Sequence, residues 1–146
     1  MIAEAGAIVS GGHMAPDKIA ILLEAARKAG ITRLLVSHPE YVIEATEQEV
    51  GRFADLGANI EHCLCMYDED SEFYHWDVGV LKRWIDLVGP ERTSLGSDLG
   101  QVGNPLPIDA FRKALDRLHD LGVREADLRR MVRDNPARLL GLDEHA

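Results

Sequence analysis

Short apolar runs alternate with amphipathic segments along this chain. Four runs, at residues 7–10, 33–37, 58–65 and 93–96, are short and apolar enough to form buried β-strands. Elsewhere apolar residues recur every three or four positions, which predicts helices. The expected helices cover residues 16–28, 46–56 (with 43 as an alternative start), 78–88, 108–121 and 125–133, and a further helical turn begins at residue 135. The order β-α-β-α-β-α-β-α-α predicts an α/β fold with a parallel sheet and right-handed crossovers.

Each apolar run leads to a polar side chain that carries chemistry. The first three runs lead to His13, His38 and His62, and the fourth leads to Asp98. In a parallel sheet, the C-terminal ends of the strands lie along one rim, where active sites are built. We therefore expect these four side chains to occupy equivalent places in four successive units.

Imidazole and carboxylate groups suit Zn²⁺ and similar divalent ions. Because His13, His38 and Asp98 come from three different strand ends, they can converge on one ion. A metal held in this way makes hydroxide available near neutral pH. A carboxylate beside that water can both bind the metal and accept the proton, and Asp98 is the candidate for both roles. A single histidine at a strand end more often caps a backbone carbonyl, so the hypothesis depends on the three residues together.

Four motifs in this order resemble the C-terminal half of the amidohydrolase superfamily, closest to the phosphotriesterase-like metal-dependent hydrolases. They are Ser10-Gly-Gly-His13, Leu35-Val-Ser-His38-Pro, Leu95-Gly-Ser-Asp98 and the closing Asn135-Pro-Ala-Arg-Leu-Leu-Gly-Leu142. The resemblance implies strands five to eight of a (β/α)8 barrel, so residues 1–146 are expected to form a single half-barrel domain.

The resemblance also implies a site. His13, His38 and Asp98 would bind the metal, with Zn²⁺ expected and Mn, Fe or Co as alternatives, and Asp98 would accept the proton of the attacking water. His62 falls on strand seven, where residues often line the substrate pocket. Glu61 is the second candidate there, because neighbouring residues of a strand face opposite ways. The expected activity is hydrolysis of an ester, lactone, amide or phosphoester bond in a small-molecule substrate.

Two features of the superfamily have no counterpart here. The chain contains no His-x-His pair, which the family has on strand one. The strand-four lysine or glutamate is also missing, because all four lysines fall in helical segments. We therefore expect an inactive isolated chain whose metal binding is weak, since zinc sites normally need at least three protein ligands. A non-catalytic α/β module, or a split subunit that acts only in a complex, is the alternative interpretation.

The composition of the chain limits the classes of binding partner and the cellular compartment that we expect. A net charge of −9 makes binding to nucleic acid or to anionic lipid unfavourable. No apolar run approaches the roughly 18 residues that span a membrane. Cys63 and Cys65 are too close for an easy disulfide and are expected to be reduced core residues, which fits a cytoplasmic protein.

Four strands of an expected barrel leave two sheet edges and one face without a partner. If the histidines point inward, Val9, Leu34, Val36 and Ile60 line the inner face. Exposed edges recruit other strands, and burial of apolar surface favours association by about 25 cal/mol per Å². The expected partner is a missing N-terminal half or a second copy of the chain.

Overall fold

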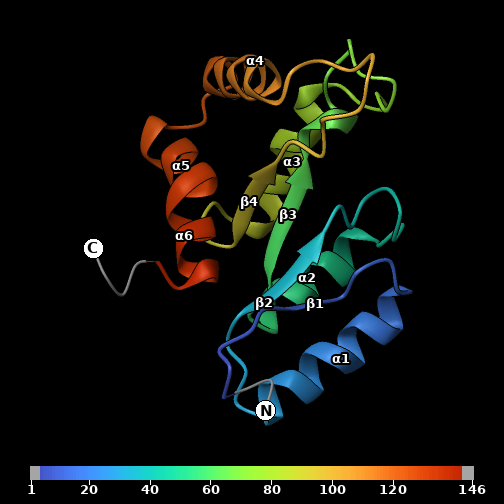
Figure 1. The fold of residues 1–146 in the computed structure, drawn as a ribbon, viewed down its shortest axis with the longest axis vertical. Coiled ribbons are helices and arrows are strands. Elements are labelled where there is room, and N and C mark those ends of the chain that lie inside the picture. Colours follow the sequence, from blue (N-terminus) through green and yellow to red (C-terminus); the bar gives the residue numbers. More distant parts are fainter. Residues whose placement is uncertain (1–3, 143–146) are drawn as a thin grey trace.

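The sheet and helices alternate as predicted in the computed structural model, which describes residues 4–142 (Figure 1). Residues 1–3 and 143–146 lie outside the described residues. The elements are β1 (Val9–Ser10), α1 (Pro16–Lys28), β2 (Leu34–Ser37), α2 (Glu47–Asp55), β3 (Asn59–Cys63), η1 (Leu64–Met66), α3 (Val78–Val88), β4 (Thr93–Gly96), α4 (Pro107–Asp120), α5 (Glu125–Arg129), η2 (Arg130–Asp134) and α6 (Asn135–Leu140). The strands pair in parallel in the order β1-β2-β3-β4. The prediction of an α/β fold with a parallel sheet is confirmed.

Local sequence signals define where the helices begin. Pro16 opens α1, where its missing N–H has no intrahelical partner to lose. Thr46 precedes α2, and its hydroxyl accepts a hydrogen bond from the Glu49 backbone N–H at 3.3 Å. The Glu49 carboxylate accepts the Thr46 backbone N–H at 2.8 Å in return. This capping box decides between the two expected starts of α2 in favour of Thr46.

The C-terminal helical segment differs from its prediction because it is continuous. The sequence predicted a break before Asn135, but α5, η2 and α6 follow one another without interruption, and η2 is a π-helix. A π-turn is wider than an α-turn and accommodates Pro136, which has no N–H to donate to the preceding turn. The Asn135 amide donates to the carbonyl oxygens of Pro90 at 2.8 Å and Thr93 at 2.5 Å. It thereby ties this helical segment to the start of β4.

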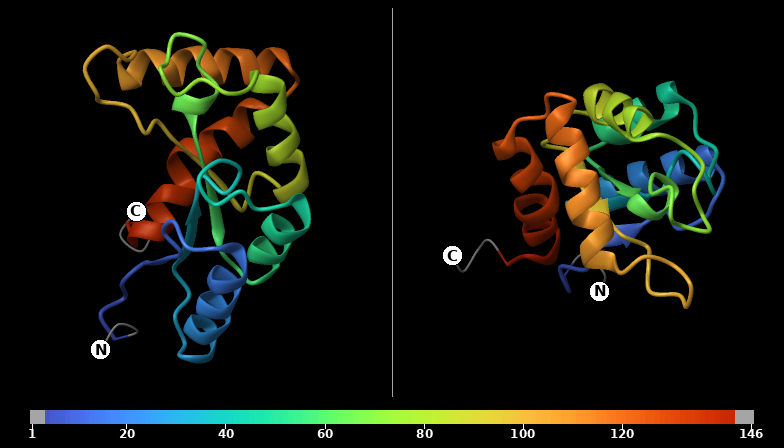
Figure 2. Two further views of the ribbon diagram at one scale, coloured as in Figure 1. Left: turned by 90° about the vertical axis from the view of Figure 1, so that its right-hand side faces the viewer. Right: turned by 90° about the horizontal axis from the view of Figure 1, so that it is seen from above.

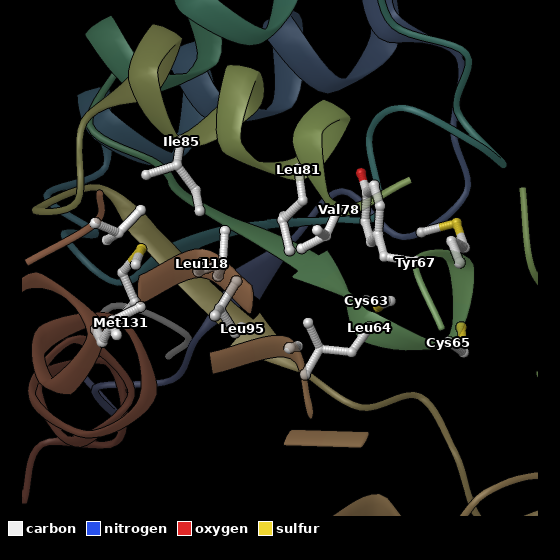
Figure 3. Close-up of a cluster of buried hydrophobic side chains, with 14 residues drawn as sticks. Cys63, Leu64, Cys65, Tyr67, Val78, Leu81, Ile85, Leu95, Leu118 and Met131 are labelled. Atoms are coloured by element: carbon white, nitrogen blue, oxygen red, sulfur yellow. The ribbon is translucent and has the colours of Figure 1, made fainter. Parts of the chain in front are cut away.

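Apolar residues of the strands and helices form two buried clusters. In one cluster, α1 and α2 contribute Ile19, Leu23, Val50 and Phe53 against β2 and β3. In the other, Leu81 and Ile85 of α3 meet Leu95 of β4, with Leu118 and Met131 closing the cluster from α4 and η2 (Figure 3). The ribbon views show α1, α2 and α3 following one another along one side of the strands, while α5 and α6 lie beside β4 (Figure 1, Figure 2). The helices therefore cover one face of the sheet.

The face on which four apolar strand residues lie was predicted incorrectly. Val9, Leu34, Val36 and Ile60 belong to the cluster that α1 and α2 cover, with the last three buried and Val9 partly buried. The prediction assumed that His38 continues the alternation of β2, which would have put it on the same side as Val36. The backbone of His38 instead has φ +35°, a left-handed conformation that interrupts the alternation.

The opposite face of the sheet is mostly polar. By alternation along the paired strands it carries Ser10, Leu35, Ser37, Asn59, Glu61 and Ser94. Asn59 donates to Ser94 at 2.7 Å on this face. The hydrophobic drive that we expected for association across this face is therefore small. Within residues 4–142, none of the helices has both the length and the apolar character needed to cross a membrane.

Candidate functional site

Three side chains with metal-binding atoms converge at the C-terminal rim of the sheet. His38 directly follows β2, Cys63 is the last residue of β3, and Asp98 comes shortly after β4. One ligand atom from each lies within 4.8 Å of the other two. Three adjacent strand ends thus bring a nitrogen, a sulfur and an oxygen atom together, and two of these residues are among those that the sequence predicted.

His13 lies beside this group. Its Nε2 atom is 3.3 Å from Nε2 of His38, with ring centroids 4.9 Å apart. Two imidazole nitrogens that bind one tetrahedral Zn²⁺ at 2.0–2.1 Å are separated by roughly 3.3 Å. The observed separation fits a shared ion, and it equally allows one ring to donate to the other when only one Nε2 is protonated.

The backbone turns sharply at two of the site residues. His38 has φ +35° and Asp98 has φ +51°, and the third non-glycine residue with positive φ in the described part of the chain is Glu44 at +53°. A left-handed conformation costs a non-glycine residue about 1–2 kcal/mol. The turn at His38 is held by a backbone hydrogen bond, which the His38 N–H donates to the Glu61 carbonyl oxygen of the neighbouring strand at 2.8 Å. Strained residues concentrate at functional sites, so the two turns support a functional role.

One buried atom of His38 has an unused hydrogen-bonding position. Its Nδ1 is buried and has no hydrogen-bond partner among the residues that the structure describes. Buried polar side-chain atoms are nearly always paired. The ion that His13 and His38 could share lies on the other nitrogen of this ring, Nε2, because the two nitrogens of one imidazole point apart. Imidazole, thiol and carboxylate donors together fit a divalent transition metal.

A buried polar cluster lies directly behind the site. The carboxylate of Glu40, two residues after His38, accepts hydrogen bonds from His62 Nδ1 at 3.0 Å and from the Tyr67 hydroxyl at 2.5 Å. The side chains of His62 and Glu40 are 0% and 2% exposed. Burial raises the pKa of Glu40, but the interactions with His62 and Tyr67 outweigh burial and hold it below its usual range. The ionised carboxylate thus anchors the turn that carries His38.

The two thiols of the site are protonated in the free protein. Burial, followed by the carboxylates of Glu61 and Asp98, raises the pKa of the Cys63 thiol well above its usual value. Burial and Asp98 raise the pKa of Cys65 to about 11. Cys65 Sγ lies 4.0 Å from Asp98 Oδ2. Nearby negative charge is the environment in which a cation is most strongly attracted.

A cavity of about 140 Å³ opens next to the site. Its walls are His38, Tyr41, Val42, Cys65, Met66, Phe73, Asp98 and Gln101. Phe73 belongs to the loop between η1 and α3, and Tyr41 comes from the loop after β2. Small-molecule sites are typically apolar hollows with a few polar groups that orient the ligand. The lining of this cavity has that composition, with His38, Asp98 and Gln101 among its polar groups.

His62 does not line this cavity, contrary to its prediction as a pocket residue. It lies within β3 on the same side as Ile60, fully buried, where its ring faces Trp84 of α3 with centroids 6.3 Å apart. Glu61, the second candidate, lies on the open face of the sheet. Its carboxylate lies over Gly96 of β4, so close that a Cβ atom added to this glycine would be 2.9 Å from Glu61 Oε1. Alternation along a regular strand accounts for this outcome.

Sequence reasoning missed three residues that belong to the site or support it. Cys63 was interpreted as a core residue, although its place two residues after Glu61 puts it on the same face of β3. Glu40 and Tyr67 lie in loops, where periodicity says nothing about direction. Of these three, only Cys63 carried a signal in the sequence that could have identified it.

A second cavity, of about 250 Å³, lies at the opposite rim of the sheet. It is lined by Thr32, Arg33, Leu34, Gly57, Asn59, Arg92, Arg138 and Leu139. Most of these residues stand at or near the N-terminal ends of the strands, while Arg138 and Leu139 come from α6. Sites of α/β proteins are built at the C-terminal ends, so we place the functional site at the other rim.

Comparison with known proteins finds a family model that matches part of the chain. A family model described as a family of unknown function (DUF6282) matches residues 1–61. The matched segment runs from β1 into β3 and includes His13 and His38. No curated protein and no solved structure matches the chain.

Proposed function

We propose that this chain carries metal-binding strands of a hydrolase of the amidohydrolase superfamily. Its four strands would correspond to strands five to eight of a (β/α)8 barrel. The observation that carries the proposal is the convergence of His38 and Asp98 at one rim of a parallel sheet, with His13 Nε2 at 3.3 Å from His38 Nε2. The resemblance of the surrounding motifs to this superfamily supports the same assignment.

Each residue has a role that its chemistry supports. A divalent ion in such a site supplies Lewis acidity and makes hydroxide available near neutral pH. His13 and His38 would hold the ion through neutral ring nitrogens. Asp98 would contribute a carboxylate oxygen and would accept the proton of a water molecule. Zn²⁺ is the expected ion for imidazole and carboxylate donors, with Mn, Fe or Co as alternatives.

The cavity next to the site suits a small substrate. Tyr41, Val42, Met66 and Phe73 provide apolar walls, and the polar side chains of His38, Asp98 and Gln101 complete the lining. An apolar part of the substrate would pack against these walls, so that the scissile ester, lactone, amide or phosphoester bond faces Asp98. Holding the bond beside the attacking water contributes to rate by orientation.

The open β1 edge and the polar face of the sheet suggest how the site is completed. A parallel edge strand presents unpaired backbone groups that pair readily with another strand. Because Ser10, Ser37 and Glu61 make the face polar, a partner that brings its own polar and ligand-bearing strands fits it better than hydrophobic contact between two copies. A polypeptide that supplies the remaining strands is the proposed partner.

Calorimetric titration of the full chain with Zn²⁺ tests the proposal. The wild type, His13→Ala, Asp98→Ala and the control His119→Ala, on the exposed side of α4, would be compared. Binding that both site variants weaken and His119→Ala preserves is the expected result. Tight one-to-one binding that survives Asp98→Ala would show that the ligand set is wrong. Hydrolysis of ester, lactone, amide and phosphoester probes, with and without the completing partner, then defines the reaction.

A further inference from the structure

Cys63 is the one member of the converging group that the resemblance to hydrolases does not explain. Its side chain is buried, with 4% of the residue exposed. A buried cysteine is commonly a core residue, and Cys63 does contact the apolar cluster behind the sheet. Its Sγ nevertheless lies within 4.8 Å of ligand atoms of both His38 and Asp98. The strand therefore aims this thiol at the same point as the imidazole and the carboxylate.

We infer that Cys63 is a thiolate ligand of the proposed ion and completes a set of His13, His38, Cys63 and Asp98. The inference rests on the proposed function, because it concerns the same site. It adds a fourth protein ligand from β3, so that four neighbouring strand ends each contribute one donor atom. This chain lacks the superfamily's strand-one and strand-four ligands. With Cys63 as an additional ligand, the chain can bind a metal by itself without the full set of those ligands.

His38, Cys63 and Asp98 can bind one ion after they contract toward it, and His13 joins them through its 3.3 Å approach to His38 Nε2. With Zn–S near 2.3 Å and Zn–N near 2.0–2.1 Å, a tetrahedral site separates sulfur from nitrogen by roughly 3.5 Å. The present limit of 4.8 Å for His38, Cys63 and Asp98 is wider. His38 and Asp98 both stand on turns after their strands, where side-chain rotation can close the gap, while Cys63 is held by β3. Zn²⁺ also accepts a fifth ligand, which leaves a position for water.

The thiol changes which ions the site prefers. Imidazole with carboxylate alone accommodates Mn²⁺ as well as Zn²⁺, whereas a thiolate favours softer ions. Coordination removes the proton of a ligating thiol outright, so the raised pKa of Cys63 does not prevent binding. A set with one thiolate therefore favours Zn²⁺ and Co²⁺ over Mn²⁺ and Mg²⁺.

Titration of the full chain with Co²⁺, followed by absorption, separates this inference from the proposed function. Bound Co²⁺ gives visible d–d bands whatever its ligands, and a thiolate ligand adds an intense sulfur-to-cobalt charge-transfer band in the near ultraviolet. The variants are Cys63→Ser and the matched control Cys65→Ser, since Cys65 is a buried cysteine whose Sγ lies 4.0 Å from Asp98 Oδ2.

We expect both sets of bands in the wild type and in Cys65→Ser. In Cys63→Ser we expect loss of the charge-transfer band, survival of the d–d bands and at least roughly tenfold weaker Co²⁺ binding, the scale seen when a supporting residue of a metal site is removed. Visible bands without a charge-transfer band in the wild type would overturn the inference and leave the proposed function standing. A charge-transfer band that is lost only in Cys65→Ser would also overturn it. Absence of any Co²⁺ or Zn²⁺ binding would overturn both.

A second measurement needs no variant and so does not depend on how Cys63→Ser folds. X-ray absorption of the Zn²⁺-loaded wild type is expected to show one sulfur scatterer near 2.3 Å together with nitrogen and oxygen scatterers near 2.0–2.1 Å. A shell of nitrogen and oxygen alone would overturn the role of Cys63 while preserving the metal site.

Discussion

The Nε2 atoms of His13 and His38 lie 3.3 Å apart, although 25 positions separate the residues in the sequence. Their strands are neighbours, with Val9 paired to Leu34 and Ser10 to Leu35. The parallel pairing of β1 and β2 brings the two chain segments that follow these strands together. The proposed metal ion, shared by the two rings, would account for this proximity, as would a hydrogen bond from one ring to the other.

His38 is the central residue of the proposed metal site because it contacts His13 and belongs to the converging group with Cys63 and Asp98. We expect His38→Ala to weaken Zn²⁺ binding by more than about 100-fold, since even the loss of an outer-shell partner costs 10–100-fold. Calorimetry of the variant beside His119→Ala measures this. Equal affinities for the two variants would contradict the role of His38.

Asp98 combines a functional carboxylate with an unfavourable backbone conformation. The backbone of Asp98 has φ +51°, a conformation that is unfavourable for any residue with a Cβ atom. The substitution Asp98→Gly removes this strain, whereas Asp98→Ala retains it. We expect the glycine variant to exceed the alanine variant in unfolding free energy by about 1 kcal/mol. Neither variant should bind Zn²⁺ as the wild type does.

Urea unfolding with parallel metal titration checks both parts of this prediction. An alanine variant as stable as the glycine variant would show that the turn at Asp98 is not left-handed in solution. Unchanged Zn²⁺ affinity in both variants would remove Asp98 from the ligand set.

Glu40 holds two buried donors, His62 Nδ1 and the Tyr67 hydroxyl. Glu40→Ala leaves both without their acceptor, and an unsatisfied buried group costs about 1–3 kcal/mol. We expect a loss of about 2–4 kcal/mol in unfolding free energy, measured by urea denaturation. Glu47→Ala is the matched control, because Glu47 forms an exposed 3.4 Å ion pair with Arg83 and should change stability by less than about 1 kcal/mol. Similar losses in the two variants would contradict the buried network.

The capping box of α2 predicts a pH dependence. Hydrogen bonds from the Thr46 backbone and hydroxyl lower the pKa of Glu49 below its ordinary value of 4.5. Because the folded pKa is the lower one, the unfolded chain binds the proton more readily. The contribution of the carboxylate to stability is therefore present above pH 4.5 and is lost as the pH falls through the lowered pKa.

Comparison of wild type with Glu49→Gln tests this sign. The wild type should be more stable at pH 7, by less than about 1 kcal/mol, the size of a typical capping effect. The difference should shrink at pH 3. A difference that grows toward low pH would contradict the hydrogen bonds of the cap.

The cysteines should react slowly with alkylating agents in the folded chain. Both are buried, and burial raises the pKa of Cys65 to about 11 and that of Cys63 still further. Since the thiolate is the nucleophile, we expect little modification by iodoacetamide at pH 8 and complete modification after denaturation. Mass spectrometry of the two samples checks this. Rapid modification of the native chain would show that β3 and η1 open readily.

The sequence by itself determined the element order and the parallel α/β class. Apolar runs of strand length and helical spacings of three and four are local patterns, and Pro16 and Thr46 marked helix starts through local chemistry. The strand-end positions of His13, His38 and Asp98 were also predictable, because one rim of a parallel sheet collects the C-terminal ends of its strands. The identification of a hydrolase stays a proposal.

Only the tertiary structure decided which side chains face the site. A positive φ at His38 turns its ring away from the side of Val36, and no periodicity reports such a turn. The alternation of β3 then sends His62 to the helices and brings Cys63 to the rim. Glu40 and Tyr67 come from two separate loops, and the Glu40 carboxylate bonds to both His62 and Tyr67. Direction at a turn and contacts between loops depend on long-range packing, whereas patterns along the chain report only local conformation and burial.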